Sequence, residues 1–397
     1  MRSKVTRIIG LLVVGIALVA TLAAAQEPIR IGALLDYTGP VADLGPKFEA
    51  GIRLALDEVG YEVAGRPIEL IIEDSATSVG VALDKFKKLV DSDGVNICIG
   101  PLMGDAHLAI APYATESGVL ATSLINGMGV IARNEIVDQS TYLIYPTTVY
   151  GQTYWFGQYC HDVLGYETMI TVGANYAGKI GYTNGVAEGF KDAGGIVTAQ
   201  MWTPLGTADY SPYISTMVGV NVDVVLYALE GPGPVARFLY QAAQAGLESP
   251  MVTITQDGDY TPEALAELQE ISLGIPGEST YSWQLDNPEN EAFVAGIMEE
   301  TGQIPSSSEQ NAYTITKIIL AALEATCGDD SIDALWPAVL AVELDTPAGP
   351  VHFTPEGVAV CPAYVTEAEL KDGEYVLSAP LYVEENVLDP TLPSSQQ

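Results

Sequence analysis

The sequence predicts an α/β protein made of two parallel-sheet units. The first unit opens with an apolar strand at 29–35, a loop rich in Gly, Pro and Thr, and a helix whose apolar residues Phe48, Ile52 and Leu56 recur at helical spacing. Strands and helices then alternate, which is typical of a parallel sheet covered by helices on both faces. The same alternation starts again near residue 150, and 397 residues are enough for two such units.

The other elements of the first unit follow from the same periodicity. Strands are expected at 68–72, 95–99 and 119–122, with helices at 79–90 and up to about residue 117. Ligands of open α/β sheets bind just outside the carboxyl ends of the strands. We therefore expect a ligand near the loops that occupy these ends, which are Asp36–Gly45, Gly100–Asp105 and Ser123–Gly129. The last two are also compatible with ordinary turns between a strand and a helix.

The second unit and the C-terminal region read in the same way. Strands are expected at 168–172, 196–201, 222–227 and 251–255, and helices at 150–163, 181–193, 210–217, 234–245 and 262–268. Further helices are expected at 288–301, 307–326 and 331–344. Residues 346–357 are rich in turn residues, and the tail from Glu384 is expected to be loosely ordered.

The first 25 residues have the pattern of a secretory signal peptide. Arg2, Lys4 and Arg7 precede an apolar run at 8–20, and three alanines at 23–25 supply small residues for cleavage. A membrane anchor is the alternative, but the run is short for a span of roughly 20 apolar residues. No Cys follows the alanines, so a lipid anchor is not expected. The sequence thus predicts a periplasmic or extracellular protein.

The composition excludes some classes of partner. The formal net charge is −35, and such a surface repels nucleic acid and anionic lipid. The 48% hydrophobic content indicates a globular core rather than an acidic disordered chain. The acidity fits either a salty environment or a plain acidic surface in dilute medium, and composition does not separate the two.

The chain contains four cysteines and three histidines. Cys98 lies in an apolar strand pattern and is expected to be a buried thiol. An exported protein can keep disulfides, and Cys327 with Cys361 is the candidate pair because both lie in loop-rich C-terminal sequence. Spacing alone does not fix this pairing, and none of the four cysteines has the spacing of a metal site.

Motifs for catalysis or cofactors are not found. The histidines are widely separated, and neither zinc-site spacing nor a Gly-x-Ser-x-Gly nucleophile elbow occurs. Gly173–Lys179 begins like a phosphate-binding loop, but Ile180 stands where Ser or Thr must hold magnesium. We expect no metal, no cofactor and no enzyme activity. A hydrolase that uses two neighbouring carboxylates remains the alternative.

Several short motifs occur in a characteristic order. Thr38-Gly39-Pro40 and Gly45 follow the first strand, and the second unit contains Asn175-Tyr176-Ala-Gly-Lys, Gly189-Phe190-Lys191, Gly194-Gly195, Asp209-Tyr210-Ser-Pro-Tyr213 and Val222-Asp223. In this order they resemble the periplasmic branched-chain amino-acid-binding protein family, the solute receptors of ABC importers. The resemblance covers about residues 28 to 380.

The resemblance implies the type I periplasmic binding fold, in which two doubly wound parallel-sheet lobes are joined by a three-strand hinge. Residues 26–146 and 280–346 would form lobe I, residues 147–279 and 347–383 lobe II, and residues 384–397 a tail. A cleft between the lobes would close about the hinge and bury a small ligand. The implied partners are this ligand and ABC permease subunits, with the receptor itself a monomer.

The resemblance also implies ligand-binding residues in lobe I. Tyr37 lies on the first loop, Met103, Gly104 and Asp105 on the first carboxylate-binding loop, and Leu124, Ile125 and Asn126 on the second. The sequence departs from the family here, because Met-Gly-Asp-Ala replaces a hydroxyl-rich stretch and Asn126 stands where Thr is usual. Asp105 would oppose a bound anion if it faced the cleft.

In lobe II the resemblance implies one aromatic and two acidic ligand contacts. Tyr176 would stack on or cover the ligand. Glu230 and Asp257 follow strands, and Asp257 is the better match for a partner of an ammonium group. The alternative for both acids is a solvated place in a surface loop.

The sequence therefore predicts an exported solute receptor of an ABC importer, with an amino acid or a related small polar molecule as ligand. A receptor for amides, urea or aromatic acids is the alternative within the same fold, and the missing hydroxyls favour it. A ligand-sensing module of a signalling system would have the same fold and is the alternative from another class.

Overall fold

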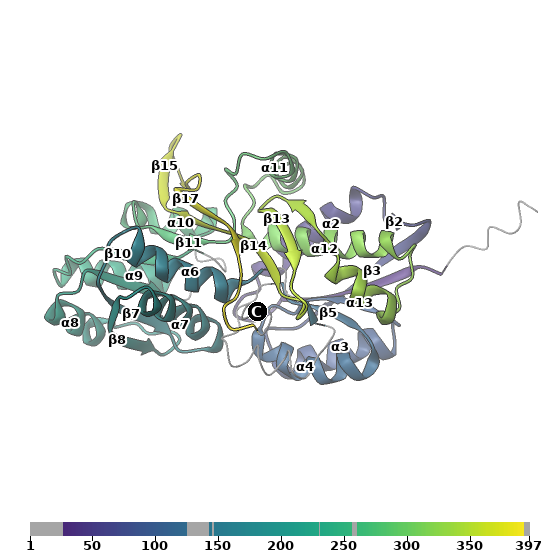
Figure 1. The fold of residues 1–397 in the computed structure, drawn as a ribbon, viewed down its shortest axis with the longest axis horizontal. Helices are drawn as coiled ribbons and strands as arrows, with labels where there is room; N and C mark the ends of the chain where they lie inside the picture. Colours follow the sequence, from purple (N-terminus) through teal and green to yellow (C-terminus); the bar gives the residue numbers. More distant parts are fainter. Residues whose placement is uncertain (1–26, 125–142, 145–146, 230, 256–259, 393–397) are drawn as a thin grey trace, which may run out of the picture.

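The protein consists of two lobes that lie side by side, each built on a β-sheet (Figure 1). The computed structural model describes residues 27–124, 143–144, 147–229, 231–255 and 260–392. Within these residues, no helix is both long enough and apolar enough to cross a membrane.

The sheet of lobe I has the strand order β2-β3-β1-β4-β5-β6. β1 pairs in parallel with β3 on one side and β4 on the other, and β2 is an antiparallel edge strand. The strands are β1 (Ile29–Leu35), β2 (Glu62–Val63), β3 (Arg66–Asp74), β4 (Ile97–Ile99), β5 (Leu120–Thr122) and β6 (Leu143–Ile144).

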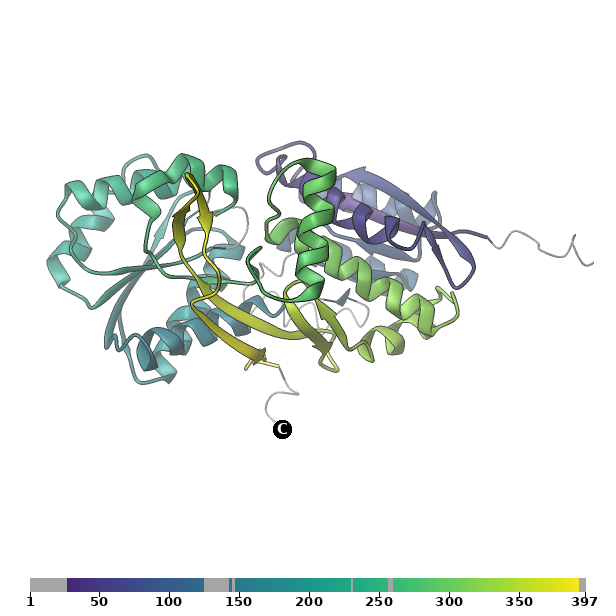
Figure 2. The same ribbon diagram turned by 90° about the horizontal axis from the view of Figure 1, so that it is seen from above.

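Helices cover both faces of this sheet. They are α2 (Leu44–Asp57), α3 (Val79–Asp91), α4 (Gly104–Ser117), α11 (Pro288–Thr301), α12 (Ser307–Ala325) and α13 (Ile332–Leu340). α3 packs against α4, whereas α2 packs against α12. Gly51 lets α2 and α12 approach closely, because a Cβ atom at this position would lie 2.2 Å from the Glu309 carbonyl oxygen. Residues far apart in the sequence thus build one lobe (Figure 2).

The sheet of lobe II has the order β12-β13-β14-β11-β10-β9-β7-β8, and β17 also pairs with β14. β7, β8, β9, β10 and β11 are parallel, whereas β14 runs antiparallel to β11, β13 and β17. The strands are β7 (Thr168–Ala174), β8 (Ile196–Thr203), β9 (Val224–Ala228), β10 (Met251–Ile254), β11 (Gly277–Ser279), β12 (Leu344–Thr346), β13 (Gly349–Phe353), β14 (Ala359–Thr366) and β17 (Tyr382–Val387).

The helices of lobe II are α6 (Val149–Asp162), α7 (Ala177–Asp192), α8 (Ser211–Val220), α9 (Pro232–Gln244) and α10 (Pro262–Leu268), with a 3-10 turn at Gln269–Ser272. A separate hairpin, β15 (Ala368–Lys371) and β16 (Glu374–Leu377), projects from this lobe (Figure 1). The two α/β units predicted from the sequence are confirmed. The second sheet is mixed rather than wholly parallel, because the C-terminal strands join it in antiparallel orientation.

Three predictions for the C-terminal region are wrong in detail. α13 ends at Leu340 rather than at residue 344, and Leu344–Thr346 is strand β12, which pairs with β13. The turn-rich segment contains β13, and the predicted tail begins inside β17. β13 and β17 form strands because both pair with the fully buried strand β14. After β17 the chain returns to lobe I, where Leu392 is buried in the core cluster of α3 and α4.

The predicted disulfide between Cys327 and Cys361 is wrong. All four cysteines lie within the described residues and are free. Cys327 is exposed just after α12 of lobe I, whereas Cys361 is buried in β14 of lobe II with its sulfur 3.6 Å from Gln152 Nε2. The two thiols belong to different lobes. Burial of Cys98 is confirmed, and burial raises the pKa of its thiol to about 12.

Candidate ligand-binding site

The strand ends of the two lobes face each other. α4 begins after β4 of lobe I, α7 begins after β7 of lobe II, and these two helices lie in contact across the lobe boundary. The carboxyl ends of parallel strands meet at one edge of a sheet, so the loops at these edges line the boundary from both sides. This is where a small molecule can contact both lobes at once.

Asp74, at the end of β3, fixes the first of these loops. Its carboxylate accepts hydrogen bonds from the backbone N–H of Tyr37 at 3.0 Å, the Thr38 hydroxyl at 2.7 Å and the backbone N–H of Ala76 at 2.8 Å. The Tyr37 hydroxyl donates to Glu49 of α2, and burial with this carboxylate raises the pKa of Tyr37. The predicted ligand residue Tyr37 therefore already has a partner within its own lobe.

The second loop, Gly100–Asp105, is fixed by a hydrogen bond to a buried histidine. His107 Nε2 lies 2.6 Å from the Pro101 carbonyl oxygen, and burial lowers the pKa of His107 to about 4. The ring is therefore neutral at pH 7, and its Nε2–H donates to the carbonyl. In the same loop, Met103 packs against the lobe I core, and Gly104 is the first residue of α4. Asp105 is exposed in the first turn of this helix.

The third loop is described only at its start. Leu124 is fully buried in the lobe I core, so its side chain offers no surface to a ligand in this conformation. Four other predicted ligand residues lie outside the described residues, and the structure does not test them: Ile125, Asn126, Glu230 and Asp257.

On the lobe II side, Tyr176 is half-buried and directly precedes α7. Lys179, three residues further on, is fully buried, and its Nζ lies 5.2 Å from the centre of the Tyr182 ring. Lysine is rarely buried to this degree. The start of a helix carries partial positive charge, so the first turn of α7 favours a negatively charged group. The sequence marked Lys179 as part of a motif but gave no sign that it would be buried.

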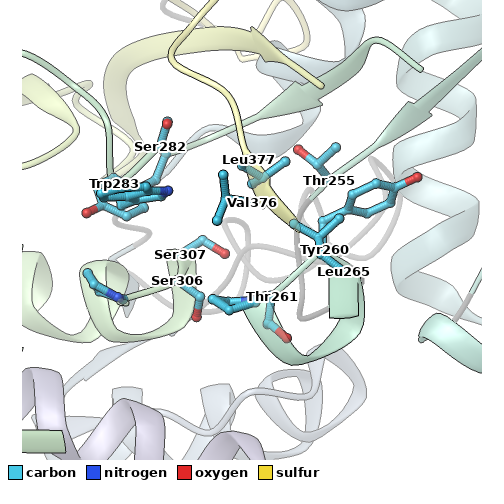
Figure 3. A pocket seen from close by; sticks show the side chains of 13 residues that line it. Thr255, Tyr260, Thr261, Leu265, Ser282, Trp283, Ser306, Ser307, Val376 and Leu377 are labelled. Carbon is cyan, nitrogen blue, oxygen red and sulfur yellow. The ribbon is translucent and has the colours of Figure 1, made fainter. Parts of the chain in front are cut away.

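A small cavity lies between the lobes on the side of α10 and α12 (Figure 3). Its walls include Thr255, Tyr260 and Thr261 of lobe II, Trp283 of the connecting segment and Ser306 beside α12 of lobe I. None of these was predicted from the sequence. The cavity holds about 20 Å³, which is room for about one water molecule, so a larger molecule can enter only if the lobes move apart.

One ion pair joins the lobes beside this cavity. Lys47 Nζ of α2 lies 2.9 Å from Glu263 Oε2 in the first turn of α10. Burial raises the pKa of Glu263, but the hydrogen bond from Lys47 and contacts at the helix start outweigh it, so this pKa lies below its usual value. Glu263 is therefore ionised at neutral pH, and its contact with Lys47 requires that the lobes be close together.

Comparison with known proteins identifies this architecture. A family model described as periplasmic binding protein matches residues 28–374. The chain belongs to the periplasmic binding protein family. The resemblance noted from the sequence motifs is confirmed, as is the type I fold with two lobes. Members of this family are exported receptors that deliver solutes to the permease subunits of ABC transporters, and they are not enzymes.

Individual relatives agree with this assignment. "Leu/Ile/Val-binding protein homolog 6" of Brucella suis is 27% identical over 90% of this chain and 92% of its own length. An ABC transporter substrate-binding protein from Sphaerobacter thermophilus has a TM-score of 0.86 at 28% identity, covering 92% of this chain and all of the other. A Rhodopseudomonas palustris solute-binding protein in complex with 3,4-dihydroxybenzoic acid has a TM-score of 0.81 at 24% identity, covering 91% and 99%. This chain is a receptor of the same architecture.

The site contains no evident metal centre. Among the residues that the structure describes, no three His, Cys, Asp or Glu side chains lie close enough to hold an ion. The geometry instead offers two helix starts, a buried lysine and several aromatic rings, a combination suited to a small organic ligand.

Proposed function

We propose that this periplasmic binding protein captures a small organic acid between its lobes and delivers it to an ABC permease. One observation carries the proposal, namely that α4 of lobe I and α7 of lobe II, which each begin after a strand end, are in contact across the lobe boundary. Both helix starts favour negative charge, and we place the negative group of the ligand beside Lys179 in the first turn of α7. A carboxylate is the group that this arrangement suits best.

An aromatic acid is the first candidate for the ligand. The loop of Met103, Gly104 and Asp105 lacks the Ser and Thr hydroxyls that would hold an α-carboxylate in lobe I, so a carboxylate placed near Lys179 is the better arrangement. Tyr176, beside α7, supplies an aromatic face. The Rhodopseudomonas palustris relative of the same fold was crystallised with 3,4-dihydroxybenzoic acid.

An amino acid is the second candidate, because the Brucella suis relative is named as a Leu/Ile/Val-binding homolog. In this arrangement Asp257 and Glu230 are the proposed partners of the ammonium group, and the backbone N–H groups at Gly104 are the proposed carboxylate site. Residues 1–25 are the proposed signal peptide, and the mature receptor acts as a monomer.

A thermal-shift screen of ligand-stripped protein tests the proposal with matched pairs of compounds. The pairs are benzoate with benzamide and leucine with leucinamide, because each differs only in the carboxylate. A ligand at 100 times its Kd adds roughly 2.7 kcal/mol to the free energy of unfolding, which raises Tm clearly. We expect a shift with benzoate or leucine and none with the matching amide. Equal shifts with acid and amide would refute the carboxylate requirement.

Two lysine variants then test the proposed anion site. Lys179→Met should abolish the shift caused by the acid, whereas Lys191→Met, in the last turn of the same helix, should leave it unchanged. Circular dichroism of both variants checks that the fold is retained. Undiminished binding of the acid by folded Lys179→Met would remove Lys179 from the site.

A further inference from the structure

A small polar cavity lies where the chain passes between the lobes. It holds about 20 Å³, and its walls include Thr147, Thr280 and Thr346, each from a different connecting segment. Gln152 of α6, and Gln310 and Thr314 of α12, also contribute polar side chains to the lining. α6 packs against α7 in lobe II and α12 against α2 in lobe I, so both lobes contribute.

Four buried polar atoms of this lining have no hydrogen-bond partner among the described residues. They are the hydroxyl oxygens of Thr147 and Thr280 and the Oε1 atoms of Gln152 and Gln310. The amide of Gln152 is oriented by its Nε2, which donates to the Pro362 carbonyl oxygen at 2.6 Å. Buried groups of this kind are almost always hydrogen bonded, so their gathering around one cavity indicates a polar occupant.

We propose that this cavity binds one water molecule, which links the two lobes at the hinge. The water accepts hydrogen bonds from the hydroxyls of Thr147 and Thr280 and donates its two hydrogens to the Oε1 atoms of Gln152 and Gln310. This uses both donors and both acceptors of a water molecule. The volume exceeds the roughly 10–15 Å³ that one water requires, and four polar partners are the upper end of the usual number.

The composition of the lining favours water over a metal ion. None of the described residues that line the cavity has a carboxylate. An ion would also need both threonine hydroxyls as acceptors, whereas water takes them as donors. Thr314 and Thr346 also line a pocket of about 360 Å³, so a route for exchange with solvent lies next to the cavity.

The water lies between Gln152 of lobe II and Gln310 of lobe I, close to the connecting segments. Hinge bending moves these lobes relative to each other, but the positions near the axis move least. A single small molecule with adjustable hydrogen bonds can remain bonded to both amides there. The inference concerns the hinge and does not depend on which ligand the cleft binds.

A high-resolution crystal structure and a pair of threonine variants test this site. We expect a density peak in the cavity at about 2.7–3.2 Å from the four oxygen atoms. Water oxygen-17 relaxation dispersion should detect one long-lived water fewer in Thr280→Val than in the wild type. Contacts of roughly 2.3–2.6 Å would indicate a hard cation instead, and they would overturn the proposal.

Thr171→Val is the matched control. Thr171 is fully buried in β7, its hydroxyl also has no partner among the described residues, and it does not line the cavity. We expect this variant to keep the number of long-lived waters and to have an unchanged or higher Tm, whereas Thr280→Val lowers Tm because it removes a partner of the water. An unchanged water count in Thr280→Val, or equal Tm changes in the two variants, would refute the proposal.

Discussion

The ion pair between Lys47 and Glu263 should shift the balance between closed and open lobes. The two residues are 216 positions apart, and they meet only because α2 of lobe I approaches α10 of lobe II. Lys47→Met keeps most of the side chain but removes its charge, and Glu263→Gln keeps the shape of the carboxylate. We expect either change to lower the population of closed molecules.

The magnitude follows from the exposure of the pair. At a separation of 2.9 Å the attraction between unit charges is ~6 kcal/mol for an effective dielectric constant of ~20, before desolvation and side-chain entropy are counted. The side chain of Glu263 is 50% exposed and that of Lys47 is 15% exposed. Measured surface pairs retain about 0.2–1 kcal/mol, so the ratio of closed to open molecules should fall about 1.4- to fivefold.

Pulsed electron spin resonance can measure this ratio without a known ligand. Cys327 is the exposed thiol of lobe I, whereas Cys98, Cys160 and Cys361 are buried. A spin label at Cys327 and another at an introduced Glu248→Cys in lobe II report the distance between the lobes. About 1 M salt should shift the wild type toward the variants, because the Debye length falls to about 3 Å.

Arg30→Met is the matched control, since the Arg30–Glu69 pair at 3.2 Å lies wholly within lobe I. It should leave the distance distribution unchanged. The variant Lys47→Met/Glu263→Gln should shift the distribution no further than either single change. The reasoning is refuted if Lys47→Met leaves the distribution unchanged, or if Arg30→Met shifts it equally.

Three further predictions concern stability and thiol chemistry. Burial lowers the pKa of His107 from 6.5 to about 4, so the stability due to its neutral form is complete above pH 6.5 and is lost as the pH falls toward 4. In urea unfolding, the difference in unfolding free energy between wild type and His107→Gln should therefore shrink by about 3 kcal/mol from pH 7 to pH 4. A difference that stays constant with pH would contradict this. Gly157→Ala places a Cβ 2.1 Å from the Val186 carbonyl oxygen and should lower the unfolding free energy by about 1–3 kcal/mol. Gly219→Ala, with open space around it, should leave the unfolding free energy unchanged. Equal losses in the two variants would contradict this prediction. Thiol titration of the denatured, unreduced protein should count four free thiols, and a count of two would indicate that a disulfide is present.

Local signals account for the elements that the sequence predicted well. α10 and α11 have the predicted bounds because each begins with Pro after a residue that caps the helix, Thr261 and Asn287 respectively. The order of motifs was also sufficient to identify the family. These features depend on neighbours in the chain, so they can be read without the fold.

The features that were missed depend on distant partners. β13 and β17 are strands because β14 pairs with both, and their own sequences resemble turn and tail. Burial of Lys179 likewise depends on how α7 packs, which its local sequence does not reveal. The ligand residues implied by the motifs remain predictions, and their local sequence did not show that Leu124 lies in the core or that the Tyr37 hydroxyl is bonded to Glu49.

The path of residues 382–392 determines where a reporter protein can be attached to this receptor. β17 belongs to the sheet of lobe II, Leu388 and Asp389 pass over Gly151 at the start of α6, and Leu392 is buried in the core of lobe I. Residues 388–392 therefore lie at the junction of the two lobes. A fluorescent protein inserted directly after Leu392 would be attached beside the moving parts, which makes this position suitable for an optical sensor of closure and unsuitable for an inert purification tag.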